Sequence, residues 1–159
     1  MGRDVLYWRR AVAKVGEPAV EAQGCCEVVV RKPYATPHDW FWQILSGGRL
    51  ERYEVHSEGR IVSWIYCVRR VYQFPFMQRE DVHIGPAYTL NKFRGRGYYK
   101  QLMMHAMEKN RKSNFWTIVE DDNYPSLRAV EAVGFRRVAY LKQNRLTKVF
   151  RVVQEFEKW

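Results

Sequence analysis

The second half of the chain carries the clearest pattern of apolar and polar positions. Apolar residues recur at helical spacing between residues 96 and 110, at Tyr99, Leu102, Met103, Ala106 and Met107. A second stripe predicts a helix that ends near Gly134, a good C-terminal stop, and its members are Ser126, Ala129, Val130 and Val133. Apolar segments separate and flank these helices and predict strands over residues 81–89, 115–119, 135–142 and 145–154.

The first half shows weaker signals of the same kind. An apolar run predicts a strand over residues 25–31, and Pro37 opens a short aromatic helix that Gly47 and Gly48 stop. Residues 50–56 and 60–69 alternate and predict a hairpin. Residues 71–80 are apolar but aperiodic, which is typical of a loop packed over a core. The order of elements predicts an α/β (α+β) fold with a mixed sheet, and we expect a single domain over residues 1–159.

Composition narrows the class of protein. Of the 159 residues, 47% are apolar and 15% aromatic, which supplies one core and excludes disorder. No apolar run approaches the ~20 residues of a membrane span, and the N-terminus lacks the apolar region of a signal peptide. The three cysteines, Cys25, Cys26 and Cys67, lack metal-ligand spacing, so we interpret them as core or surface thiols. We therefore expect a soluble, cytoplasmic protein with no membrane partner and no metal.

The positive charge is concentrated in one stretch of the sequence. The chain has a formal net charge of +10, and the stretch Lys92–Lys112 holds seven basic residues and one acid, Glu108. Such a cluster favours a polyanionic partner, which could be a nucleic acid, an acidic lipid or a small phosphorylated ligand. It is equally compatible with a solvated helix face, so charge leaves these alternatives open.

A glycine-bearing basic loop lies between the 81–89 strand and the helix that follows. It reads Arg94-Gly95-Arg96-Gly97, with Lys100 shortly after. Glycines let successive backbone N–H groups converge, and a helix N-terminus adds partial positive charge, so the segment predicts an anion site. A dinucleotide fingerprint would need Gly in place of Lys100, and a Walker A loop would need Gly-Lys-Ser/Thr, so both are excluded.

With a second motif, this loop resembles the GNAT superfamily of acyl-CoA-dependent acetyltransferases. The family's phosphate loop reads Arg/Gln-x-x-Gly-x-Gly/Ala after its fourth strand, and residues 94–99 match it except at Tyr99. The family's Asn-x-x-Ser/Ala with a later Gly-Phe is matched by Asn123, Ser126 and Gly134-Phe135. The resemblance covers about residues 60–145. It implies a mostly antiparallel mixed sheet with a central splayed strand and flanking helices.

The resemblance implies acetyl-CoA as co-substrate. Its diphosphate would lie on the backbone amides of residues 95–100, its pantetheine arm would pair with the splayed end of the 81–89 strand, and Asn123 would hold that arm. A bulge at Gly85-Pro86 fits such a splay, and we expect the ring of Tyr99 to pack in the core. The cofactor-binding residues so implied are Ala87, Tyr88, Thr89, Arg94, Gly95, Arg96, Gly97, Tyr98, Tyr99, Lys100 and Asn123.

Two residues are candidates for acid–base catalysis. Several GNAT enzymes carry a base, Glu or His, six residues before the last cofactor-pairing residue, and that count from Thr89 reaches His83. The ordinary histidine pKa of about 6.5 suits the role, although a strand histidine bound to a carbonyl is the alternative. Many relatives place a tyrosine acid where this chain has Val130. Ser126 is then the candidate acid, or its hydroxyl caps the following helix.

The expected activity is N-acetyl transfer from acetyl-CoA to a primary amine of a small molecule, for example an amino sugar or a nucleotide-linked amino sugar. The first alternative keeps the enzyme class but gives it a protein N-terminus or lysine as acceptor. The second is a basic nucleic-acid-binding module, which the absence of an aromatic RNA-recognition signature and of zinc-ligand spacing disfavours. Trp40 and Trp42, with residues 74–76, are candidates to line an acceptor pocket. A homodimer stays open.

Overall fold

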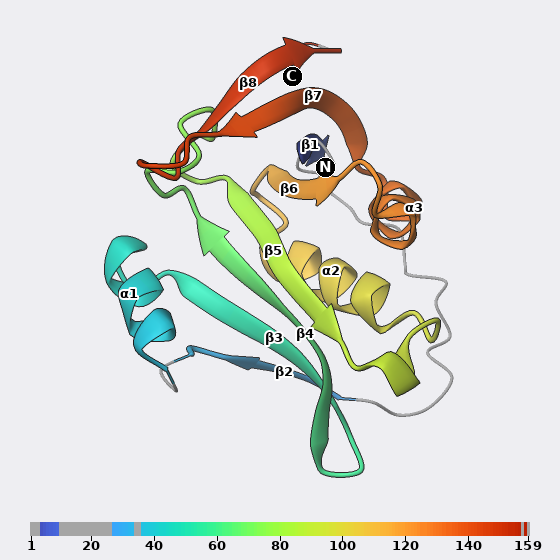
Figure 1. Ribbon diagram of the computed structural model, residues 1–159. Coiled ribbons are helices and arrows are strands. Elements are labelled where there is room, and N and C mark those ends of the chain that lie inside the picture. The colour runs from blue at the N-terminus through green and yellow to red at the C-terminus, as the bar shows by residue number, and fades with distance from the viewer. Residues whose placement is uncertain (1–3, 10–26, 34–35, 157, 159) are drawn as a thin grey trace.

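The computed structural model describes residues 4–9, 27–33, 36–156 and 158. Their strands form one eight-stranded sheet in the order β2-β3-β4-β5-β6-β1-β7-β8 (Figure 1). Neighbouring strands are antiparallel except β5 and β6, which run parallel. The strands are β1 (Asp4–Arg9), β2 (Val28–Arg31), β3 (Leu50–Ser57), β4 (Arg60–Arg69), β5 (Val82–Thr89), β6 (Phe115–Glu120), β7 (Arg136–Gln143) and β8 (Phe150–Glu155). The helices are α1 (Pro37–Leu45), the short 3-10 helix η1 (Asn91–Phe93), α2 (Tyr98–Lys109) and α3 (Tyr124–Ala132).

The expected fold class is confirmed, and most predicted elements lie close to their predicted bounds. The last strand is the exception in the second half, because it begins at Phe150 and not at residue 145. Residues 144–149 form a turn in which the Asn144 side chain accepts hydrogen bonds from the N–H groups of Leu146 and Thr147. This local use of backbone donors by an Asn side chain removes those residues from the strand.

The first half follows its predicted pattern where it is described. Thr36 and Asp39 form a capping box at the start of α1, in which each side chain accepts the other residue's backbone N–H. The hairpin of β3 and β4 is present, and residues 70–81 form the expected loop. The strand predicted over residues 25–31 is described from Val28, so Cys25 and Cys26 lie outside the described residues.

Strand β1 is the element that the pattern did not predict. It lies between β6 and β7 and pairs antiparallel with both. Val5, Leu6 and Tyr7 are consecutive and all fully buried, so both faces of the strand are covered. A strand buried on both faces has no polar–apolar alternation, which explains why the short segment carried no recognisable signal.

The two faces of the sheet are covered by different elements. On one face, α2 packs Leu102, Met103 and neighbouring side chains against a core that includes Val82 and Ile84 of β5. On the other face, a second cluster contains Phe74 and Met77 of the 70–81 loop, with Trp42 of α1 against it. Figure 1 shows α1 on one side of the sheet and α2 with α3 on the other. Among the described residues, no helix is long and apolar enough to cross a bilayer.

Strands β5 and β6 part after two residue pairs. They pair only at Val82–Phe115 and His83–Trp116, so residues 84–89 of β5 have no partner on the β6 side. On its other edge β5 stays paired with β4, but Gly85 and Pro86 lie together opposite Tyr66. The predicted bulge is therefore present, and β5 is the splayed strand that the sequence implied.

Candidate functional site

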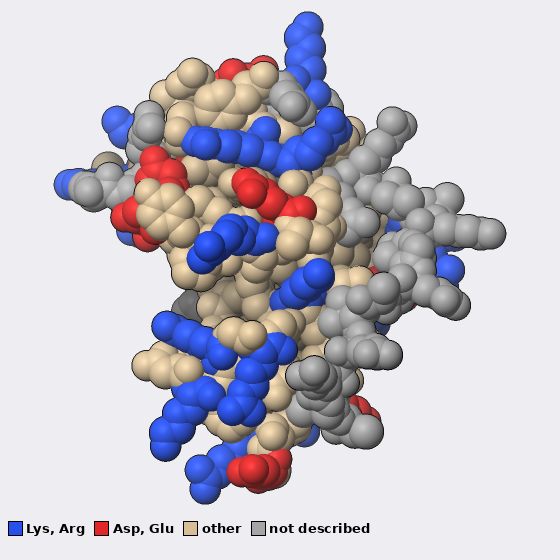
Figure 2. Space-filling view, turned by 90° about the vertical axis from the view of Figure 1, so that its right-hand side faces the viewer, with Lys and Arg blue, Asp and Glu red and all other residues tan. Residues whose placement is uncertain are grey.

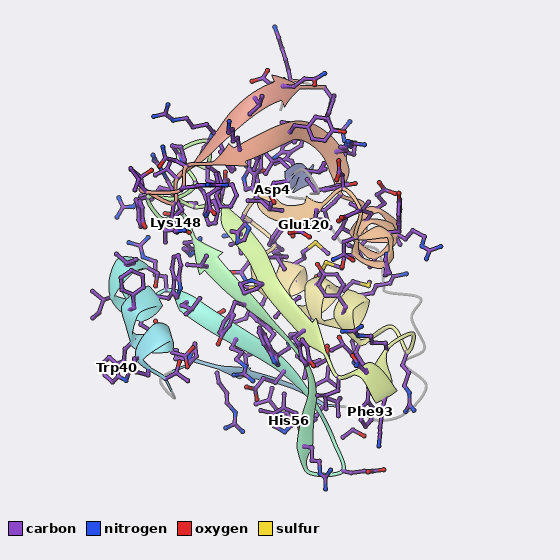
Figure 3. All side chains as sticks on the ribbon, viewed as in Figure 1. Asp4, Trp40, His56, Phe93, Glu120 and Lys148 are labelled. Atoms are coloured by element: carbon purple, nitrogen blue, oxygen red, sulfur yellow. The ribbon has the colours of Figure 1, made fainter. Side chains whose placement is uncertain are left out.

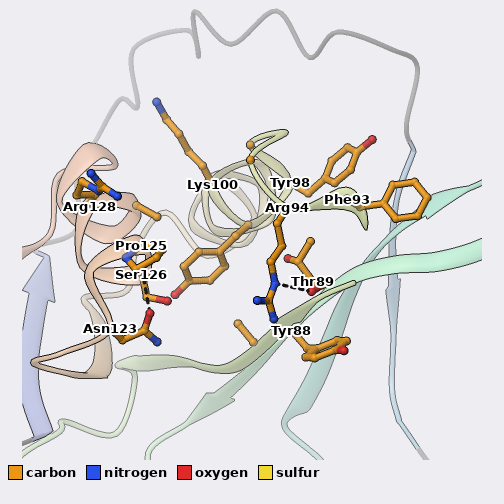
Figure 4. Close-up of a pocket in the computed structure, with 15 residues that line it drawn as sticks. Tyr88, Thr89, Phe93, Arg94, Tyr98, Lys100, Asn123, Pro125, Ser126 and Arg128 are labelled. Carbon is orange, nitrogen blue, oxygen red and sulfur yellow. Dashed lines mark hydrogen bonds between the residues drawn. The ribbon is translucent and has the colours of Figure 1, made fainter. Parts of the chain in front are cut away.

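The parting of β5 and β6 opens a cleft of about 540 Å³ (Figure 4). The end of β5 forms one side, and the loop before α2, together with the first turns of α2 and α3, forms the rest. The lining residues are Ala87, Tyr88, Thr89, Phe93, Arg94, Gly95, Gly97, Tyr98, Tyr99, Lys100, Asn123, Pro125, Ser126, Arg128 and Ala129. The cleft thus brings together every residue of the expected cofactor set except Arg96.

The start of α2 presents backbone N–H donors to this cleft. Its N-cap is Gly97, whose φ of 77° is left-handed and which has no capping side chain. The first helical hydrogen bond runs from Gln101 N to Gly97 O, so the N–H groups of the first turn point out from the helix end. Together with the positive end of the helix dipole, these donors form an anion-binding surface.

Side-chain charge reinforces the anion site. Arg94, Lys100 and Arg128 line the cleft, and none of the described lining residues is Asp or Glu. Figure 2 shows this side of the molecule, where Lys and Arg side chains gather in the lower half of the view. Arg128 was not among the expected cofactor residues, because the motif that begins at Asn123 does not extend along α3 to its position.

Two of the loop arginines are held by contacts within the loop region. Arg94 donates from Nε to the carbonyl oxygen of Thr89 at 3.2 Å, which ties the loop to the end of β5. The guanidinium of Arg96 lies 5.0 Å from the centre of the Phe93 ring. Arg96 itself does not line the cleft, although the Phe93 ring that it contacts does.

The N-terminus of α3 is capped by Asn123 and not by Ser126. Asn123 Oδ1 accepts a hydrogen bond from the backbone N–H of Ser126 at 3.4 Å. The interpretation of the Ser126 hydroxyl as the cap is therefore wrong, because Ser126 lies inside the helix and only its backbone takes part. Its side chain lines the cleft, whereas Val130, in the position of the family's tyrosine, is fully buried in the core.

The ring of Tyr99 packs against the core cluster beneath α2, as its place in the helical stripe predicted, and it also lines the cleft. Tyr98 is the buried residue of this turn, and Tyr99 is partly buried and lines the cleft. Burial raises the pKa of Tyr99 to about 12, although a hydrogen bond with Thr117 opposes the effect.

His83 lies in a second, smaller pocket of about 90 Å³. Its neighbours along β5, Val82 and Ile84, face α2, so its own side chain points to the opposite face of the sheet. There its ring stacks on Phe74, with 4.3 Å between centroids and 23° between planes. The lining residues are Trp42, Leu50, Tyr66, Val68, Gln73, Phe74, His83, Gly85 and Pro86.

The expected acceptor-pocket aromatics are only partly brought together. Trp42 and Phe74 line the small pocket beside His83. Trp40 does not line it; 55% of its surface is exposed, and it points outward from α1 (Figure 3). Phe76 packs against Trp116 instead, with ring centroids 5.3 Å apart. The helical period of α1 explains the separation, because residues two apart face different sides of a helix.

The environment of His83 differs from that of an ordinary surface histidine. Burial lowers its pKa to about 4, and the backbone of Gly85 beside the ring only partly opposes this shift. Both ring nitrogens are buried, and neither makes a hydrogen bond of ordinary geometry to the described part of the chain. His83 is therefore uncharged at neutral pH, in contrast to the near-neutral pKa that its residue type suggested.

The small pocket and the large cleft adjoin along β5. Gly85 and Pro86 line the small pocket, and the next three residues of the strand line the cleft. The junction follows directly on His83, the last residue at which β5 pairs with β6. A molecule lying along the splayed end of β5 would therefore reach the pocket that holds His83.

Comparisons with known proteins agree with this architecture. A family model described as the acetyltransferase (GNAT) family matches residues 19–135. No curated protein sequence matches the chain.

Several solved structures share the fold. A GNAT-family acetyltransferase from Colwellia psychrerythraea is 13% identical with a TM-score of 0.59, and the match covers 86% of this chain and 53% of that one. The IAA acetyltransferase from Bacillus cereus ATCC 14579 is 15% identical with a TM-score of 0.55, covering 77% and 85%. The ribosomal-protein-S18-alanine N-acetyltransferase from Escherichia coli is 13% identical with a TM-score of 0.53, covering 75% and 83%. The chain thus spans little more than half of the Colwellia protein.

Proposed function

The chain belongs to the acetyltransferase (GNAT) family, and on this premise we propose that it transfers the acetyl group of acetyl-CoA to a primary amine of a small molecule. The observation that carries the proposal is the basic cleft at the parted strands, which adjoins a pocket containing an uncharged histidine. In the proposed reaction the amine nitrogen forms the amide bond and the thioester C–S bond breaks. One proton leaves the nitrogen, and CoA leaves as the thiol.

The residues of the cleft fit the chemistry of acetyl-CoA. The backbone N–H groups at the start of α2 and the cations of Arg94, Lys100 and Arg128 suit its phosphates. The free edge of β5 at residues 87–89 suits the amide groups of the pantetheine arm, because that edge lacks a β6 partner. The Oδ1 atom of Asn123 caps α3, so its amide NH2 is the group available to a ligand.

We assign the general base to His83 and the general acid to Ser126. A neutral imidazole whose ring nitrogens have no hydrogen-bond partner among the described residues can accept a proton from the attacking amine, and His83 lines the pocket that follows the cleft along β5. Ser126 supplies a hydroxyl that lines the cleft. Thiols ionise near pH ~8.5, so the departing sulfur needs little help and the acid matters less than the base.

This function accounts for the basic stretch without a nucleic-acid partner. Three cations of the loop and helices converge on one cleft, which is what a compact polyphosphorylated ligand requires. A nucleic-acid-binding surface would instead distribute such residues along an extended groove. The cytoplasm, where acetyl-CoA is available, is the compartment that the proposal requires.

Isothermal titration of acetyl-CoA into the purified chain tests the proposal. We expect saturable binding that weakens as salt is raised, since phosphate contacts are screened. Lys100→Gln should weaken binding by roughly tenfold or more, as expected for loss of a charge-assisted contact. Arg151→Gln is the matched control, because Arg151 is an exposed cation on β8 outside the cleft. An absence of binding, or equal losses in the two variants, would contradict the proposed function.

A further inference from the structure

We propose that the acceptor is a primary amine carried on a small aromatic or similarly flat apolar group, which enters the pocket formed by Trp42, Phe74 and His83 as the uncharged amine. This inference rests on the proposed function and adds the chemical class of its second substrate. It is carried by the shape and chemistry of the pocket and by the unsatisfied nitrogens of His83.

The walls of the pocket offer few partners for a polar substrate. Its aliphatic and aromatic lining includes Leu50, Val68 and Phe74, and most of its polar groups already have partners. The hydroxyl of Tyr66 donates to Asp39 Oδ1 at 2.8 Å, and the carbonyl of Gln73 accepts from Phe150 N. The Gln73 side chain and the His83 ring remain. An amino sugar would bury several hydroxyls with too few partners, which is costly.

The volume and geometry of the pocket suit a single flat group. The pocket holds about 90 Å³ and opens to solvent beside the partly exposed Trp42 and Tyr66. An apolar protein cavity of about 150 Å³ binds benzene without water, so this smaller pocket would enclose a ring only in part, with the rest of the ring at its open mouth. The stacked rings of Phe74 and His83 form a flat wall, which favours offset stacking or edge contact with another ring.

The charges around the pocket favour the neutral amine over the ammonium ion. None of the described lining residues is Asp or Glu. One lining residue, Tyr66, is hydrogen-bonded to a carboxylate, that of the buried Asp39. Burial alone would raise the pKa of Asp39, but its hydrogen bonds with Tyr66 and Thr36 outweigh that effect and lower the pKa. Arg52 lies behind Tyr66, 5.9 Å from the ring centre. An ammonium ion would therefore be desolvated without a free counter-ion.

The buried ring nitrogens of His83 have no hydrogen-bond partner among the residues that the structure describes. Buried polar atoms without partners are uncommon in native proteins and call for an explanation. A neutral primary amine has N–H donors and one lone pair, so it can donate to a His83 ring nitrogen while its lone pair stays free to attack. The same contact orients the amine toward the junction with the cleft.

A panel of amines assayed by CoA release tests the substrate class. The panel is 2-phenylethylamine, butylamine, glucosamine and a peptide with an N-terminal alanine, each with saturating acetyl-CoA. We expect kcat/KM for 2-phenylethylamine to exceed that for glucosamine and the peptide by tenfold or more. It should also rise about tenfold per pH unit below the amine pKa, as expected when only the neutral form reacts. A preference for glucosamine or the peptide, or a flat pH profile with 2-phenylethylamine, would overturn the inference.

Two tryptophans on the same helix supply a matched pair of variants. Trp42→Ala should reduce kcat/KM for 2-phenylethylamine by tenfold or more while leaving acetyl-CoA affinity unchanged, and Trp42→Phe should retain most of it. Trp40→Ala should have little effect, because Trp40 does not line the pocket. Thermal melts identify any variant that fails to fold; if Trp42→Ala does not fold, Trp42→Leu and Trp40→Leu, which each keep an apolar side chain but remove the flat ring, take the place of the two alanine variants. Equal effects at both positions would contradict the inference.

A binding measurement separates failure of this inference from failure of the proposed function. The 19F signal of 4-fluorophenylethylamine should broaden on addition of wild-type protein without acetyl-CoA, and less with Trp42→Ala. Broadening without acetyl-CoA binding would disprove the enzyme assignment but support the pocket. Acetyl-CoA binding and turnover of other amines, without broadening, would support the enzyme and disprove this pocket assignment.

Discussion

The imidazole of His83 lies almost flat against the ring of Phe74, with centroids 4.3 Å apart. Phe74 belongs to the 70–81 loop and is 5% exposed, so this loop contributes directly to the burial of a strand histidine. The contact helps to bury His83, which stands six residues before Thr89 where several GNAT enzymes carry their base. That burial explains why its pKa is about 4. A charged imidazolium would lose its hydration there without gaining a partner.

The first prediction is that His83 makes the fold sensitive to mild acid. The unfolded chain would protonate this histidine near pH 6.5 and the folded chain only near pH 4. The stability contribution is therefore full above about pH 6.5 and is lost as pH falls toward about 4, by on the order of 3 kcal/mol. His83→Gln should remove this part of the acid dependence, which urea unfolding at a series of pH values measures. His105→Gln, on α2, is the control and should leave the acid dependence in place.

The second prediction compares two glycines with the same backbone conformation. Gly97 has φ +77° and Gly59 has φ +72°, and an added Cβ would meet no atom within 4 Å at either position. Alanine at either site should cost about 1–3 kcal/mol, because positive φ is strained for other residues. Only Gly97→Ala should also weaken acetyl-CoA binding, since its methyl group would lie where the backbone approaches the ligand.

Calorimetry on both glycine variants separates the two effects. Chemical unfolding should show similar losses of stability, and titration with acetyl-CoA should show a loss of affinity for Gly97→Ala only. If Gly59→Ala lost the same affinity, the effect at Gly97 would be a general consequence of destabilisation. If Gly97→Ala bound normally, the loop would not be the phosphate site.

The third prediction concerns the start of α3. Because Asn123 Oδ1 accepts the N–H of Ser126, Asn123→Ala should lower stability by about 1 kcal/mol through loss of the cap. Ser126→Ala keeps that backbone donor and should change the thermal midpoint little. Kinetics run beside the melts should show less than a tenfold loss of turnover for Ser126→Ala. A large loss of stability in Ser126→Ala would show that its hydroxyl supports the helix after all.

The features that could be predicted from the sequence depend on patterns among residues close together in the chain. The loop of residues 94–97, the start of α2 and the bulge at Gly85-Pro86 each follow from neighbours within a few positions. Their local conformations position the loop and the start of α2, whereas the cleft also depends on the parting of β5 from β6 and on the position of α3. The expected cofactor residues, which the family resemblance implied, all line the cleft except Arg96, and the lining adds Arg128, which was not expected.

The features that the sequence patterns missed depend on contacts between distant segments. In strand β1, Val5 pairs with Val119 and with Tyr140, which are both more than a hundred residues away in the sequence. The six residues of β1 carry no local pattern that predicts a position between β6 and β7. His83 could be counted from Thr89, but its burial depends on an aperiodic loop. The apolar character of the acceptor pocket depends on α1, β4 and that loop meeting on one face. Contacts between such distant segments are determined by tertiary packing, and the periodicity of a short segment carries no information about them.

The last prediction concerns Asp4, which lies directly opposite Glu120 in the pairing of β1 with β6 (Figure 3). Burial, with Glu120 and then Asp121 nearby, raises the pKa of Asp4 above its ordinary value of 3.8. Its folded form therefore holds a proton more tightly than its unfolded form, so stability falls as pH rises through the folded pKa. Asp4→Asn should raise the thermal midpoint at about pH 7 and raise it less in mild acid, with solvent screening limiting the gain. Asp122→Asn, an exposed neighbour in the turn after β6, is the control and should shift the midpoint less. A gain for Asp4→Asn that did not depend on pH would show that the carboxyl's charge is not what destabilises this end of the sheet.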